Sequence, residues 1–189
     1  MLSERRRQRG AGGASPCARA LASPHLRWKI VGREALVGAV RSLQRAGKRV
    51  VFTNGCFDLL HVGHVRYLQS ARELGDALVV GVNSDASVRR LKGEDRPINP
   101  ARDRAEILAA LACVDFVTIF NAATPLRLIR AVGPDILVKG GDWPLEAIVG
   151  REAVEARGGS VLTIPFEKRR STSELVERIR GAAPAAPGA

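Results

Sequence analysis

Residues 55–64 read Gly-Cys-Phe-Asp-Leu-Leu-His-Val-Gly-His, and they follow the apolar, β-prone run Val-Val-Phe-Thr at 50–53. A helix-like stretch over 65–74 comes directly afterwards. The order is strand, tight turn and helix, and His61 and His64 place two cationic or hydrogen-bonding groups at the helix start. This layout is typical of a nucleotide phosphate site, because the amides at a helix N-terminus attract anions.

The rest of the chain alternates apolar strand-like runs with amphipathic helix-like stretches. This alternation predicts an α/β fold, a Rossmann-like doubly wound parallel sheet with helices on both faces. Ligands of such sheets bind beyond the carboxyl ends of the strands, where the polar signatures of this sequence fall. The expected strands are 50–53, 77–82, 116–120, 136–138 and 160–165. The expected helices are 33–46, 65–74, 86–91, one opened by Asn99 as N-cap and running to about 112, one starting at 124–125, and 173–180.

The two histidines are three residues apart, a spacing that brings both rings to one side of a helix start. Zinc would need three or four ligands, and no other cluster of His or Cys exists in the sequence, whose third histidine is His25. Two buried core histidines are another interpretation, but Gly63 between them indicates close approach of the backbone to a ligand. We therefore predict an anion site built from imidazole N–H groups and helix amides.

Six positions of the quoted stretch resemble the GxFDxxHxGH signature of the cytidylyltransferase-like nucleotidyltransferases, a Rossmann-like superfamily. Members transfer a nucleotidyl group from ATP or CTP to a phosphate or a phosphorylated alcohol or sugar, and they release pyrophosphate. The resemblance implies that His61 and His64 contact the triphosphate and stabilise the transition state at the α-phosphorus. The six positions are Gly55, Phe57, Asp58, His61, Gly63 and His64.

Further segments resemble one branch of this family, the D-glycero-β-D-manno-heptose 1-phosphate adenylyltransferases, over roughly 27–180. The Leu-Lys-Gly loop at 91–93 and the Lys-Gly-Gly-Asp turn at 139–142 favour this branch over the glycerol-phosphate and ethanolamine-phosphate cytidylyltransferases. In the bifunctional version a sugar kinase precedes this domain. Here a short Arg-rich segment does, so the resemblance implies that a separate heptose kinase supplies the sugar 1-phosphate. The other matching segments are 82–85, 89–93, 96–100 and 114–115.

The resemblance also implies roles for other side chains. Lys92 and Lys139 are expected to act with the two histidines in catalysis, although Lys92 could instead be a solvated loop lysine. The sugar phosphate is expected to meet Asp85, Lys92, Arg104 and Trp143. The nucleotide is expected to meet Asn54, Gly55, Cys56, Phe57, Asp58, His61, Gly63, His64, Gly141, Asp142, Ser171 and Thr172.

Several of these roles have a purely structural alternative. Asp58 and Asp85 could orient substrate, position a basic side chain or interact with magnesium, or they could serve a turn or a helix cap. Ser171 and Thr172 open the last expected helix, where they could act as N-caps as well as phosphate contacts. Trp143 could stack near the base or cover the core.

The implied reaction converts ATP and heptose 1-phosphate to ADP-heptose and pyrophosphate, as a precursor step for lipopolysaccharide or another surface glycan. The sugar phosphate would attack the α-phosphorus directly, since nothing in the motifs resembles an activated Ser, Cys or Lys nucleophile. We expect Mg²⁺ to be carried by ATP and pyrophosphate with few protein ligands, and we predict no metal site of the protein itself.

Length and charge fit this interpretation. A chain of 189 residues can form one domain, expected over 28–181, and no apolar run approaches the roughly 20 residues of a membrane span. The net charge of +11 is divided between residues 1–29, with +6, and the other 160 residues, with +5. We expect a disordered basic tail over 1–27 and a second tail over 182–189. The first resembles an organellar transit peptide, but a nonfunctional extension or an early start codon also explains it.

Three cysteines, Cys17, Cys56 and Cys113, form no framework, which fits a reducing compartment. We expect a cytoplasmic protein, and the resemblance implies a homodimer or higher homo-oligomer. A cytidylyltransferase acting on a polyol or amino-alcohol phosphate such as glycerol 3-phosphate is the alternative enzyme. A basic nucleic-acid-binding module is a distant alternative, because aromatic residues for stacking make up 4% of the chain. We predict neither a nucleic-acid nor a membrane partner.

Overall fold

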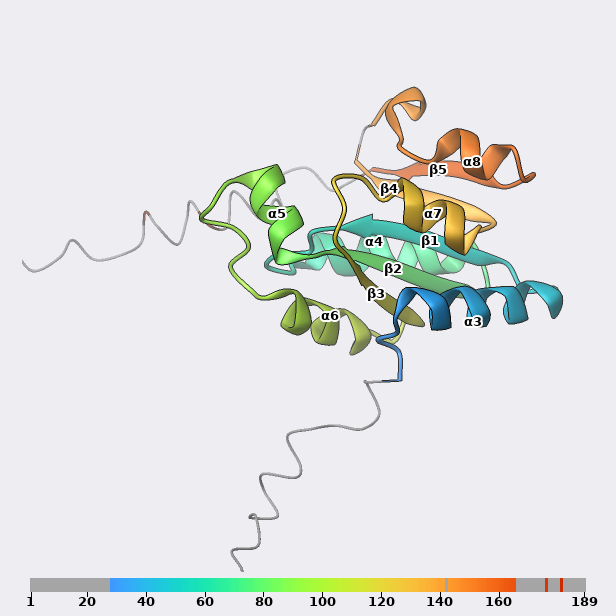
Figure 1. The fold of residues 1–189 in the computed structure, drawn as a ribbon, viewed down its shortest axis with the longest axis horizontal. Coiled ribbons are helices and arrows are strands. Elements are labelled where there is room, and N and C mark those ends of the chain that lie inside the picture. The colour runs from blue at the N-terminus through green and yellow to red at the C-terminus, as the bar shows by residue number, and fades with distance from the viewer. Residues whose placement is uncertain (1–27, 142, 166–175, 177–180, 182–189) are drawn as a thin grey trace, which may run out of the picture.

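A five-stranded parallel sheet forms the centre of the computed structural model, which describes residues 28–141, 143–165, 176 and 181 (Figure 1). The strand order is β3-β2-β1-β4-β5, and every neighbouring pair is parallel. This confirms the predicted fold class. The strands are β1 (Val50–Gly55), β2 (Ala77–Asn83), β3 (Phe116–Phe120), β4 (Ile136–Gly140) and β5 (Ser160–Ile164).

Helices cover both faces of the sheet (Figure 1). Residues of α4 and α6 pack in one buried cluster, and residues of α3, α7 and α8 pack in a second cluster on the opposite face. The helices are α3 (Arg33–Arg45), α4 (Val62–Glu73), α5 (Asp85–Lys92), α6 (Ala101–Ala109), α7 (Leu126–Val132) and α8 (Arg151–Glu155), with a short 3-10 turn, η1 (Leu145–Ala147). Within the described part of the chain, no helix has the length and apolar character needed to cross a membrane.

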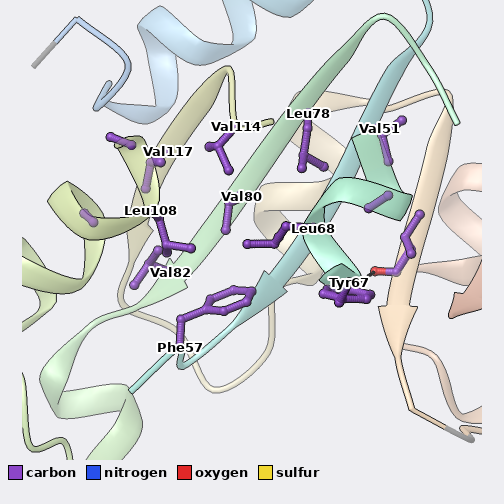
Figure 2. Close-up of a cluster of buried hydrophobic side chains, with 14 of the residues drawn as sticks. Val51, Phe57, Tyr67, Leu68, Leu78, Val80, Val82, Leu108, Val114 and Val117 are labelled. Atoms are coloured by element: carbon purple, nitrogen blue, oxygen red, sulfur yellow. Dashed lines mark hydrogen bonds between the residues drawn. The ribbon is translucent and has the colours of Figure 1, made fainter. Parts of the chain in front are cut away.

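The two clusters arise from the alternation of side chains along each strand. In β2, Leu78, Val80 and Val82 belong to the cluster with α4 and α6, while Val79 belongs to the other cluster. Figure 2 shows the first cluster, with Leu68 of α4 pointing toward the strands. Because both faces are covered, the strands read as nearly continuous apolar runs, as parallel strands usually do.

The neighbouring strands β1 and β4 are followed by connections that lie on opposite faces of the sheet. The connections through α4 and α6 lead from β1 to β2 and β3, and the connections through α7 and α8 lead to β4 and β5 on the other face. Adjacent strands whose connections leave in opposite directions open a crevice at their carboxyl ends. The sequence motif at 55–64 begins at Gly55, the last residue of β1, and therefore enters this crevice.

Some boundaries differ from the predicted ones. Helix α4 begins at Val62, three residues early, so His61 is its N-cap. Helix α6 begins at Ala101 with Pro100 as N-cap, in place of the predicted Asn99. The reason is that the Asn99 backbone is used elsewhere: its N–H donates to Asp58 and its carbonyl accepts from Arg104.

Other differences lie toward the C-terminus. Strand β4 continues two residues beyond its predicted end. Helix α8 was not predicted, because five residues are too few to display a helical period. The expected helix over 173–180 falls almost entirely outside the described residues, as do the expected tails over 1–27 and 182–189.

Candidate active site

A cavity of about 570 Å³ lies at the carboxyl ends of β1, β2 and β4. Nine of the residues predicted for the site line it: Asn54, Gly55, Cys56, Phe57, Asp58, His64, Lys92, Lys139 and Trp143. Five others that the structure describes do not line it: His61, Gly63, Asp85, Arg104 and Gly141. Asp142, Ser171 and Thr172 lie outside the described residues. Lining residues without a predicted role are Tyr67, Asn83, Leu91, Arg96, Leu137, Gly140 and the segments 123–125 and 147–149.

The two motif histidines meet at the start of α4. Their ring centroids are 4.0 Å apart, and the backbone N–H of His61 donates to Nδ1 of His64 over 3.4 Å. A neutral imidazole has one donor and one acceptor nitrogen. Because Nδ1 of His64 is the acceptor, the neutral ring carries its proton on Nε2, which is then a hydrogen-bond donor.

His64 is neutral at physiological pH. Burial lowers the pKa of His64 to about 4, and repulsion from His61 and Lys92 acts in the same direction. Of the two forms that the sequence allowed, cationic or hydrogen-bonding, the structure therefore favours the neutral hydrogen-bond donor in the protein without ligand.

Two lysines reach the cavity from different elements. Lys139 extends from β4, and its Nζ donates to the Asn54 carbonyl over 3.4 Å. Burial lowers the pKa of Lys139, while its Coulombic interaction with Cys56 opposes this shift. Lys92 is the last residue of α5 and is exposed. The cavity thus has a half-buried amine on one wall and a solvated amine on another.

Asp58 anchors a loop beneath the cavity. Its carboxylate is buried and pairs with Arg96 over 2.6 Å. It also accepts from the backbone N–H groups of Ile98 and Asn99 at 2.9 to 3.0 Å. Burial alone would raise the pKa of Asp58, but these hydrogen bonds and the Arg96 charge hold the pKa below its usual range. Among the roles open from sequence, the structure supports positioning of a basic side chain.

Arg104 was predicted at the substrate phosphate, and the structure places it elsewhere. Its side chain is 0% exposed and lies beneath the cavity, where it pairs with Asp85 over 2.8 Å. Asp85, predicted beside the sugar phosphate, is the first residue of α5 and does not line the cavity. Both residues therefore support the site without lining it.

Tyr67 is a site residue that the sequence reasoning missed. Its hydroxyl lies 2.6 Å from Thr53 Oγ1 and donates to the Val138 carbonyl over 3.2 Å. It thereby joins α4 to both strands that flank the crevice. Figure 2 labels Tyr67 within the buried cluster. A polar atom on the apolar face of a helix needs a buried partner, and that requirement was the available signal.

Part of the cavity lining is apolar. Trp143 is 53% exposed, so it does not cover the core, and it lines the cavity together with Leu91 and Val149. Between residues 28 and 165, Asp142 excepted, no three His, Cys, Asp or Glu side chains are grouped to hold a metal ion. The cavity thus combines basic and hydrogen-bonding groups with an apolar rim formed by Leu91, Trp143 and Val149.

Comparisons with known proteins agree with this geometry. The sequence pattern of the Cytidylyltransferase-like family matches residues 52–178. The bifunctional protein HldE of Citrifermentans bemidjiense is 61% identical over 151 residues, which are 80% of this chain and 31% of that protein. The chain therefore spans about a third of the length of this curated relative.

Two solved structures share the fold. A lipopolysaccharide core biosynthesis protein from Thermoplasma volcanium superposes with a TM-score of 0.54 and 30% identity, covering 66% of this chain and all of that one. A pantoate-beta-alanine ligase from Francisella tularensis has a TM-score of 0.55 and covers 76% of this chain and 68% of that one. At 14% identity, the ligase supports the fold alone.

Replacing Asp58 with Asn should destabilise the protein by about 2–4 kcal/mol at pH 7, because Arg96 loses its buried partner. A carboxyl whose folded pKa is lowered contributes stability above the unfolded pKa and loses it as pH falls through the folded pKa. The difference in free energy of unfolding between wild type and Asp58→Asn should therefore shrink as the pH falls below about 4. Urea unfolding across pH measures this, with the exposed Glu106→Gln as control. A difference independent of pH would contradict the assignment.

In the free protein, the His64 ring should titrate near pH 4 in an NMR pH series, well below the ordinary value near 6.5. Lys92→Met should raise this midpoint, because Lys92 is one of the charges that oppose protonation. A wild-type midpoint of 6 or above, or no response to Lys92→Met, would show that the ring environment differs from the one described.

Proposed function

Since the chain belongs to the cytidylyltransferase-like family of nucleotidyltransferases, we propose that it converts ATP and D-glycero-β-D-manno-heptose 1-phosphate to ADP-heptose and pyrophosphate. The observation that carries this proposal is the 61% identity to a bifunctional HldE protein across 80% of the chain. The similarity to a lipopolysaccharide core biosynthesis protein supports a role in making lipopolysaccharide or another surface-glycan precursor.

The lining residues suit the joining of two anions. Nucleotidyl transfer brings a phosphate nucleophile against a triphosphate, so the site must offset several negative charges and align the attack. Lys92 and Lys139 supply positive charge from two sides, and His64 supplies a neutral Nε2–H donor. The amides at the start of α4 add a partial positive charge. The substrate enters as the magnesium complex of ATP, with Mg²⁺ held by its phosphates.

The reaction needs little from the protein beyond this positioning. An oxygen of the sugar phosphate forms a bond to the α-phosphorus, and the bond from the α-phosphorus to the bridging oxygen of the β-phosphate breaks. The electron pair leaves with pyrophosphate. The attacking oxygen is already ionised near neutral pH, so no general base has to remove a proton. Preorganised donors aimed at the developing charge then supply most of the catalysis.

The apolar rim of the cavity is suited to contact the nucleobase. Leu91, Trp143 and Val149 present apolar side chains to the cavity. Planar bases are favoured on such surfaces, because stacking on an aromatic ring stabilises them without consuming hydrogen bonds. We assign this rim to the adenine of ATP. We further propose cytoplasmic action, a homo-oligomeric state, and an upstream heptose kinase that supplies the sugar phosphate.

Changing His64 to Ala should lower kcat by about 10²–10³-fold, because a donor at the transferring phosphorus is lost. The unfolding midpoint should change little by comparison, since the ring lies at the cavity wall. Steady-state kinetics and thermal unfolding measure both quantities, with Gln69→Ala on the exposed face of α4 as the matched control. A His64→Ala variant with kcat close to wild type would contradict the role of this ring.

Pyrophosphate release with Mg²⁺ tests the substrates, with ATP or CTP offered against heptose 1-phosphate or glycerol 3-phosphate. We expect release with ATP and heptose 1-phosphate alone. Release with CTP and glycerol 3-phosphate would replace the proposed reaction by that of the cytidylyltransferases. Nucleotide binding without release in any combination would show that the acceptor is wrong, and absence of nucleotide binding would overturn the proposal.

A further inference from the structure

Arg104 is a permanently charged side chain with no exposed surface. Its guanidinium donates four hydrogen bonds: Nε to the Asn99 carbonyl over 2.9 Å, Nη1 to the Cys56 carbonyl, and Nη2 to the Asn83 carbonyl and Asp85 Oδ1 over 2.8 Å each. Burial of a charge is costly unless it is paired and hydrogen-bonded, and these four bonds meet that condition.

The four acceptors come from the segments that frame the cavity. Cys56 follows β1 in the motif loop, and Asn83 ends β2. Asp85 begins α5, the helix that ends at Lys92. Asn99 lies just before α6, and its backbone N–H donates to Asp58. One planar side chain thus fixes the motif loop and the start of the Lys92 helix relative to each other.

The motif loop needs such support. Phe57 has φ of 47° and Leu59 has φ of 61°, in the left-handed region that residues with a Cβ disfavour. Such a backbone conformation is unfavourable for these residues, so the loop relaxes unless its surroundings hold it. Asp58, between them, accepts hydrogen bonds from Arg96 and from two backbone amides. Arg104 donates to the carbonyl of Cys56, the residue before Phe57.

We propose that Arg104 is a positioning residue that couples the motif loop to α5, and so sets where the groups of the loop stand relative to Lys92. It acts through the Cys56 and Asn83 carbonyls and Asp85, and it touches no ligand. A residue that served the core alone would change stability without changing this coupling. The inference rests on the proposed function for its kinetic test and on the structure alone for its exchange test.

The first test is amide hydrogen exchange of Arg104→Lys, followed in peptides spanning 55–61 and 84–92. Lysine keeps the charge but cannot span four acceptors, so exchange in both segments should accelerate by about tenfold or more while β3 and β4 keep their protection. Arg102→Lys, on the exposed face of the same helix, is the matched control and should leave both segments unchanged. Exchange that rises uniformly, or no more than in Arg102→Lys, would overturn the proposal.

A second variant covers the case in which Arg104→Lys does not fold. Asp85→Asn keeps an oxygen acceptor and removes the charge of a side chain that is 33% exposed. If the coupling runs through Arg104, exchange should accelerate in 55–61, a segment that does not contain residue 85. Acceleration confined to 84–92 would overturn the proposal.

The kinetic test is a double-mutant cycle with Lys92→Ala. Arg104→Lys should lower kcat by about 10–100-fold, as small misplacements in an active site do. The fold-decrease in kcat caused by Lys92→Ala should then be about tenfold smaller in the Arg104→Lys background than in wild type. The reason is that Lys92 is already displaced in that background. Full additivity of the two losses would overturn the coupling. Absence of nucleotidyl transfer in the wild type would refute the proposed function, and the exchange test would still decide the role of Arg104.

Discussion

The backbone between β1 and α4 must turn from an extended strand into a helix within six residues, 56–61, and the rest of the site depends on that turn. The chain makes it with Phe57 and Leu59 in left-handed conformations. Such a loop is unfavourable on its own. Two buried ionic groups hold it, Asp58 from within and Arg104 from below, and both do so mainly through hydrogen bonds to the main chain. As a result, α4 begins at the crevice between β1 and β4, and His64 on its first turn lines the cavity.

Electrostatics suits the site to an anionic ligand. Lys92, Lys139 and Arg96 all line one cavity, and burial already lowers the pKa of Lys139. Burial keeps the His64 ring neutral, and repulsion from His61 and Lys92 acts in the same direction, so no further positive charge is added there. The free protein thus keeps its donors in place while limiting the repulsion among them. An incoming polyphosphate would remove that repulsion, so binding gains both from new hydrogen bonds and from relief among groups already present.

The sequence predicted the sheet well because its strands are short apolar runs that end at glycine, asparagine or proline, and because the motif after β1 has one recognisable layout. It predicted the side chains of the motif that line the cavity for the same reason. It failed where a side chain finds its partners far along the chain. Arg104 was expected at a ligand, yet its acceptors lie in three separate segments. Asp58 meets Arg96 across 38 positions, and Tyr67 meets Val138 across 71, so neither pairing has a local signal.

The acceptors of Arg104 carry a consequence for how such a site can diversify. Three of them, at Cys56, Asn83 and Asn99, are main-chain carbonyls, which every amino acid possesses. Substitution at position 56 alters the surface that a ligand meets and leaves the acceptor in place. Position 104 has no such freedom, since only a guanidinium offers that fork of donors. The residues that line the cavity can therefore be substituted one at a time during evolution. The hydrogen bonds that Arg104 makes beneath the cavity persist through such substitutions, because they do not depend on those side chains.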